Sequence, residues 1–107
     1  MRTVKGEEDV MENTIKTRVI KRNGEEVSFD LTKIVNAIRK ANQEVDQLHR
    51  MNEYQIIAIA EKIAQQAESA MHAVNVEDIQ DMVETGIMEM RGYEVAQKYV
   101  RYRYKRE

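Results

Sequence analysis

Three cations, an aromatic ring and a predicted helix start lie between residues 21 and 33. Lys21 and Arg22 precede an Asn-Gly pair, Phe29 follows that pair, and Lys33 falls in the first turn of a predicted helix. Cationic side chains and the free N–H groups of a helix start bind phosphates, whereas apolar side chains and exposed strand backbone hold a base. The pattern indicates a nucleoside triphosphate site. The ordinary alternative is a core Phe29 with solvated cations.

Basic residues form a second group at the far end of the chain. The first group is Lys16, Arg18, Lys21 and Arg22, and the second is Lys98, Arg101, Arg103, Lys105 and Arg106. The formal net charge is only −2, so the chain as a whole is not expected to bind polyanions. The two groups either meet in space and bind one anion, or form two solvated edges.

The combinations of residues that support catalysis are missing from the sequence. There is no cysteine, and His49 and His72 have no sequence neighbour that makes a metal pair or a nucleophile–base pair, so both are expected to be surface histidines. The four glycines form no phosphate-loop pattern. We therefore predict no catalytic site, no metal site and no enzyme activity for this chain alone. The charged N-terminus and the lack of a long apolar run predict a soluble, cytoplasmic protein without membrane contact.

A β-hairpin is predicted to carry the first basic group. Two short runs rich in β-branched residues, 16–22 and 25–29, flank Asn23-Gly24. This pair predicts a type I′ turn, which needs positive φ at both central residues. Residues 1–14 lack periodicity and are expected to form a flexible arm.

Two helices with apolar stripes are predicted to follow the hairpin. The first is capped by Asp30 and stops near Asn42. The second starts at Asn52, where Gln55 completes a capping box, and its apolar spacing continues to Met71. No element is predicted for the polar residues between these helices.

The remaining sequence predicts two more helices. One starts at Asn75, with Asp78 at the capping-box position, and ends at Gly92. The other starts near Tyr93 and runs into the basic, aromatic tail. The predicted fold class is mainly α: a four-helix cluster capped by a small β-hairpin or sheet.

Three strings of residues resemble the ATP-cone family. Val-Ile-Lys-Arg-Asn-Gly at 19–24, with Val-Ser-Phe-Asp-Leu-Thr-Lys-Ile at 27–34, is similar to its opening. Residues 76–84 resemble its third helix, and residues 94–103 resemble its closing pattern of alanine, tyrosines and arginine. The strings occur in order and cover residues 17 to 106.

The resemblance implies a regulatory domain over residues 15–107, most like the N-terminal domain of an anaerobic ribonucleoside-triphosphate reductase. Its implied ligand is ATP or dATP with Mg²⁺ held by phosphates and water. The implied partners are the catalytic domain of the reductase and, depending on the nucleotide, further copies of the chain. A related bacterial repressor carries a four-cysteine zinc ribbon before its cone, which this sequence lacks.

The resemblance also assigns nucleotide contacts by position. The phosphate set is Lys21, Arg22, Lys33 and, less closely matched, Lys105. The adenine set is Val27, Ser28 and Phe29, and the set near the sugar or base is Val76 and Gln80. Asn23 replaces the usual aspartate of the turn, and Val27 stands where some members carry an acidic residue.

Two alternatives from other functional classes remain open. A nucleic-acid-binding or transcriptional regulator module would use the basic hairpin and tail, with bases stacked on Phe29, Tyr99, Tyr102 and Tyr104. A ligand-free interaction domain would use some of the seven methionines as an adaptable surface, although we interpret them as core filling. Steep salt dependence without saturable ATP binding would favour the first alternative.

Overall fold

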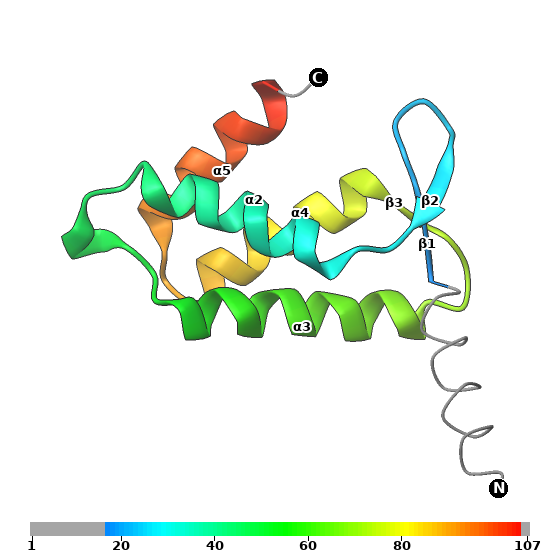
Figure 1. The fold of residues 1–107 in the computed structure, drawn as a ribbon, viewed down its shortest axis with the longest axis horizontal. Helices are drawn as coiled ribbons and strands as arrows, with labels where there is room; N and C mark the ends of the chain where they lie inside the picture. The colour runs from blue at the N-terminus through cyan, green and yellow to red at the C-terminus, as the bar shows by residue number, and fades with distance from the viewer. Residues whose placement is uncertain (1–16, 106–107) are drawn as a thin grey trace, which may run out of the picture.

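A computed structural model describes residues 17–105, with side chains described through Arg103 (Figure 1). Its helices are α2 (Leu31–Gln43), α3 (Glu53–Ser69), α4 (Val76–Glu89) and α5 (Tyr93–Lys105), with a 3₁₀ turn η1 (Gln47–His49). Its strands are β1 (Arg18–Ile20), β2 (Glu26–Ser28) and β3 (Val74–Asn75). The predicted mainly-α class is confirmed. The arm predicted for residues 1–14 lies outside the described residues.

The strands form one small sheet at the end of the helical cluster (Figure 1). β1 pairs with β2 in antiparallel register, with Val19 opposite Val27. β1 also pairs with β3 in parallel, with Val19 opposite Val74 and Ile20 opposite Asn75. The sequence analysis did not predict β3, because a strand of two residues shows no alternating pattern.

The hairpin is confirmed, but its predicted type I′ turn is wrong. The Gly24 amide donates to the Lys21 carbonyl at 2.8 Å, and Gly24 has φ of +90°. Among the non-glycine residues described, positive φ occurs only at Met71 and Arg91. Asn23 therefore has negative φ, whereas a type I′ turn would need positive φ there. The connection is therefore a three-residue loop with glycine in the left-handed position. The Asn23 side chain accepts a hydrogen bond from the Glu25 amide instead.

The caps of α2 and α3 form as predicted. Asp30 accepts from the Thr32 amide at 3.0 Å, and Asn52 and Gln55 form a reciprocal capping box. The end predicted for α3 is wrong, because this helix stops at Ser69. Met71 has φ of +63° and is 94 % exposed, so it lies outside the apolar stripe.

The predicted boundaries of α4 need two corrections. Asn75 caps the helix without a side-chain hydrogen bond, so no capping box with Asp78 forms; its backbone is held in β3 beside Ile20. At the other end, Arg91 rather than Gly92 takes the left-handed conformation, with φ of +64°. Gly92 is required for space, because a Cβ there would lie 2.8 Å from the Met51 sulfur.

One apolar core joins the four described helices and the sheet. It is built mostly from aliphatic side chains, with Met51 and Tyr99, and its largest fully buried side chains are Ile38, Ile56, Val83, Ile87 and Val95. α3 and α4 approach closely, because Gly86 leaves room for the Ile59 side chain. None of the described helices has the length and apolar character needed to cross a membrane.

Candidate functional site

A smaller cleft of about 310 Å³ lies between α3 and α4, and a cleft of about 540 Å³ lies between the hairpin, α2, α4 and α5. This volume is in the range of ligand pockets, about 300–1,000 Å³. Its apolar lining is Val19, Val27, Phe29, Ile34, Ala37, Val76, Ile79, Val83, Tyr99 and Tyr102. Its polar lining is Lys21, Arg22, Asn23, Ser28, Asp30, Lys33, Gln80 and Arg103. We call this cleft the hairpin cavity.

The side chains that line the hairpin cavity include more cations than anions. Its lining has four cationic side chains, Lys21, Arg22, Lys33 and Arg103, against the single carboxylate of Asp30. That carboxylate already caps α2 by accepting from the Thr32 amide. An excess of cations in a concave site attracts anions and increases their local concentration. The cavity is thus suited to a polyanionic ligand with an apolar portion.

Lys33, the cavity cation on α2, differs from the cations of the hairpin turn in its ion-pair partners. Among the ion pairs of the described residues, none involves Lys33, whereas the Lys21 ammonium lies 3.5 Å from the Glu25 carboxylate. Lys33 stands in the first turn of a helix of 13 residues, where the backbone N–H groups also favour negative charge. Its full charge is therefore available to a ligand.

Arg22 is held across the cavity by the first turns of α4. Its Nε donates to Glu77 at 3.0 Å, and one terminal nitrogen donates to Gln80 at 3.1 Å. These contacts join residues 55 and 58 positions apart in sequence. They attach the hairpin turn to α4 and place a carboxylate where it competes for the guanidinium.

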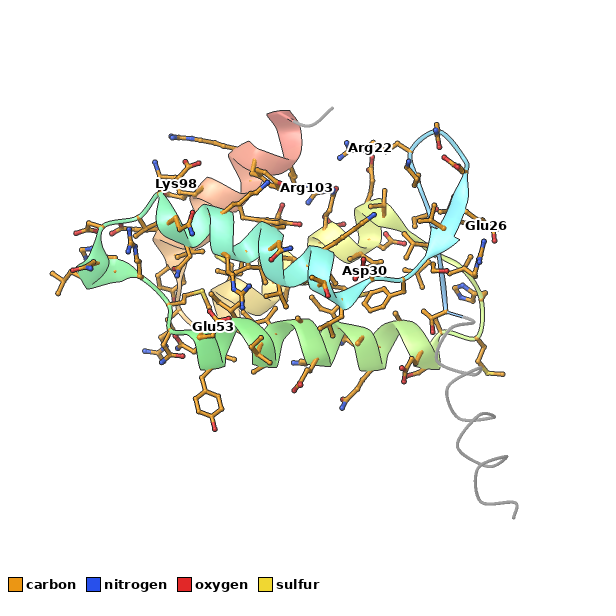
Figure 2. The ribbon with its side chains drawn as sticks, viewed as in Figure 1. Arg22, Glu26, Asp30, Glu53, Lys98 and Arg103 are labelled. Atoms are coloured by element: carbon orange, nitrogen blue, oxygen red, sulfur yellow. The ribbon has the colours of Figure 1, made fainter. Side chains whose placement is uncertain are left out.

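Arg103 forms the α5 side of the cavity and is the most buried charge described (Figure 2). One of its terminal nitrogens donates to Asp81 at 3.0 Å and to Glu84 at 2.6 Å, which ties α5 to α4. Burial disfavours its charge, but the hydrogen bonds to Glu84 and Asp81 outweigh burial and raise the Arg103 pKa. Its Nε is buried without a hydrogen-bond partner, so one donor remains unsatisfied.

The apolar wall of the cavity combines core residues with partly exposed ones. Phe29 and Val27 pack partly buried against the core while lining the cavity, so Phe29 serves both roles. Tyr99 lies deeper, and burial raises its pKa to about 12, which keeps its hydroxyl neutral at physiological pH. Tyr102 lies between the Tyr99 ring, 6.5 Å away, and the ammonium of Lys40, 5.6 Å from its ring centre.

The hairpin cavity brings together eight of the residues that the sequence analysis selected. They come from the turn, β2, the start of α2 and α4: Lys21, Arg22, Val27, Ser28, Phe29, Lys33, Val76 and Gln80. The Lys105 side chain lies outside the described residues. Contact of these residues with a nucleotide remains a prediction. The basic groups at the two ends of the sequence also meet in part, because Lys21, Arg22 and Arg103 share this cavity.

Three polar or aromatic residues of the lining, Asp30, Tyr102 and Arg103, were not among the nucleotide contacts predicted from the sequence. Asp30 was assigned only to helix capping, although its position in the motif at 27–34 also places it in the cavity. Tyr102 and Arg103 belong to the closing pattern at 94–103, but this pattern alone does not separate inward-facing from outward-facing residues of the tail. Helical spacing from Tyr99 to Arg103 is the clue that would have identified the inward face.

Comparison with known proteins identifies the class of this domain. The family model of the ATP cone domain matches residues 17–107, and the chain belongs to that family. The chain is also similar to the anaerobic ribonucleoside-triphosphate reductase of Haemophilus influenzae, with 31 % identity over 90 residues. That match covers 83 % of this chain but only 12 % of the reductase.

Proposed function

We propose that the hairpin cavity binds ATP or dATP, and that the chain acts as the regulatory domain of a ribonucleoside-triphosphate reductase. Lys21, Arg22 and Lys33 contact the triphosphate, and Val27, Ser28 and Phe29 contact the adenine. The observation that carries the proposal is the combination of an apolar wall and four lining cations in one cleft of about 540 Å³. Membership of the ATP-cone family and similarity to a reductase support the same ligand and context.

The remaining predicted contacts divide between sugar and phosphate. Val76 and Gln80, in the first turns of α4, line the cavity, and we propose that they contact the sugar or the base. Arg103 adds a fourth cation to the cavity lining, although one of its terminal nitrogens already donates to Asp81 and Glu84. Lys105 is proposed as a further phosphate contact from its position in the family pattern. Mg²⁺ enters with the nucleotide, bound by phosphates and water.

Regulation requires that the two nucleotides stabilise different states. ATP and dATP differ by one hydroxyl, and a single hydrogen bond contributes about 0.5–1.5 kcal/mol. Allosteric coupling between two sites is typically about 1–3 kcal/mol. The hydroxyl alone therefore supplies modest discrimination, and we propose that it also changes the geometry or the number of nucleotides bound. The bound nucleotide then changes either the contact with the catalytic domain or the oligomeric state of the chain.

Calorimetric titration of the full chain with ATP, dATP and GTP, each with Mg²⁺, tests this function. We expect saturable binding of both adenine nucleotides in the micromolar range, which corresponds to about −8 kcal/mol. We also expect the two to differ in stoichiometry or in the oligomer formed, which sedimentation measures. No saturable ATP heat, together with steeply salt-dependent oligonucleotide binding, would replace this function by nucleic-acid binding.

Replacing Glu77 by glutamine is expected to tighten ATP binding about three- to tenfold. The carboxylate holds Arg22 at 3.0 Å and repels incoming phosphates, so its neutralisation leaves more of the guanidinium charge to the ligand. Both charges are partly exposed, which keeps the expected gain near 1 kcal/mol. The matched control is Glu61→Gln, an exposed α3 carboxylate outside the cavity lining. Weaker ATP binding in Glu77→Gln would mean that Glu77 positions Arg22 for the ligand.

A further inference from the structure

A histidine and two carboxylates from separate parts of the chain converge at the end of the molecule opposite the sheet (Figure 1). Asp46 precedes η1, His49 ends η1, and Glu94 stands in the first turn of α5. The His49 Nδ1 lies 2.8 Å from an Asp46 oxygen and 3.4 Å from a Glu94 oxygen. The three ligand atoms all lie within 4.8 Å of one another.

The arrangement gives one imidazole nitrogen two anionic neighbours. Nδ1 carries at most one proton, so it makes a full hydrogen bond to only one carboxylate at a time. When Nδ1 is deprotonated, its lone pair is free to bind an ion, and one oxygen each of Asp46 and Glu94 lies within 4.8 Å of it. Imidazole nitrogen and carboxylate oxygen are the donors that Zn²⁺ and similar transition-metal ions take at about 2.0–2.2 Å.

The side chains have the freedom to close around such an ion. The exposed fractions are 51 % for His49, 64 % for Asp46 and 50 % for Glu94, so about half or more of each side chain faces solvent, where small rotations are possible. Water has access to the remaining coordination positions. An exposed site of three protein ligands binds more weakly than a closed structural site of four.

We infer that Asp46, His49 and Glu94 form a surface site for a divalent transition-metal ion, with Zn²⁺ as the best-matched ion. The bound ion cross-links the α2–α3 connection to the start of α5. The proposal departs from the sequence-based prediction that His49 has no metal-pairing neighbour, because Asp46 lies three residues before it and the fold adds Glu94. The other histidine, His72, bonds through Nδ1 to the Ala73 carbonyl and belongs to no such cluster among the described residues.

Titration of the nucleotide-free chain with Zn²⁺, in competition with a chromophoric chelator at pH 8, tests the site. We expect one ion per chain. The dissociation constant for Zn²⁺ should be at least tenfold higher in His49→Ala, because this variant lacks one of the three protein ligands. His72→Ala removes the same residue type elsewhere and should change the binding constant less than twofold. Equal losses in the two histidine variants, or no saturable binding in the wild-type chain, would overturn the inference.

The cross-link itself has a separate test in Glu94→Gln. We expect this variant to lose about tenfold in Zn²⁺ affinity and to lose the rise in melting temperature that Zn²⁺ gives the wild-type chain. Unchanged affinity in Glu94→Gln would restrict the site to Asp46 and His49 and would refute the cross-link. Since no nucleotide is present, these results are independent of the proposed ATP site.

Discussion

Replacing Lys33 by alanine is expected to weaken ATP binding roughly ten- to hundredfold. Hydrogen bonds to charged groups contribute about 1.5–3 kcal/mol, and each 1.4 kcal/mol changes affinity about tenfold. The effect should be large because no ion pair of the described residues neutralises Lys33, and because it stands in the first turn of α2, where the helix dipole favours negative charge. Calorimetric titration with ATP and Mg²⁺ measures it.

Two further lysine variants test whether the loss of ATP affinity is specific to the position of Lys33. Lys62→Ala removes the same charge from α3, where Lys62 pairs with Glu89 at 3.4 Å beside the smaller cleft, and should leave ATP affinity within twofold. Lys21→Ala should weaken binding less than Lys33→Ala, because Glu25 already neutralises part of the Lys21 charge. If Lys33→Ala binds ATP as tightly as Lys62→Ala does, the triphosphate does not lie at the start of α2.

Replacing Arg103 by alanine is expected to lower the free energy of unfolding by about 2–3 kcal/mol. Breaking a buried ion pair from one side costs about 3–5 kcal/mol, and the solvent exposure of the partners reduces this cost. The Arg103 side chain is 10 % exposed, whereas Asp81 is 68 % and Glu84 is 29 % exposed. Chemical denaturation measures the change directly, and the melting temperature should fall by roughly 10–20 °C.

The control for Arg103 is its exposed neighbour on the same helix. Arg101→Ala should change the free energy of unfolding by no more than about 0.5 kcal/mol, as is usual for surface positions. Arg103→Met keeps most of the buried volume but not the ion pairs, so its stability should lie between those of Arg103→Ala and the wild type. Equal stability of Arg103→Ala and Arg101→Ala would contradict the role of Arg103 in joining α5 to α4.

Local sequence rules predicted the elements well where one local interaction decides the structure. The caps at Asp30 and Asn52 formed as expected, because a side-chain acceptor and a nearby backbone N–H suffice. The rules failed where tertiary pairing intervenes. β3 exists only because β1 lies beside it, and Asn75 is held by that pairing rather than by a capping box with Asp78.

The same distinction applies to the candidate sites. The hairpin and the start of α2 are contiguous in sequence, so local spacing was enough to select Lys21, Phe29 and Lys33. The α4 positions Val76 and Gln80 came from family resemblance rather than from spacing. Arg103 was missed because its role depends on the packing of α5 against α4, far along the chain.

The Asp46, His49 and Glu94 cluster shows why distant partners escape a sequence-based search. Asp46 and His49 are three residues apart and are detectable as a local pair, but Glu94 reaches them only through the fold.

The hairpin turn at Asn23 was mispredicted for a different reason. Two turn types share the same Asn-Gly signal, and a three-residue loop with positive φ at Gly24 alone replaced the expected one.

The most direct measurement is the change in backbone amide NMR shifts of the full chain when ATP and Mg²⁺ are added. We predict that the largest changes lie at Lys21, Arg22, Ser28, Lys33 and Gln80, which line the hairpin cavity. A triphosphate held between the hairpin turn and the start of α2 must perturb these amides first. Unchanged shifts in millimolar ATP, or changes confined to the smaller cleft around Gly86, would contradict binding in the hairpin cavity.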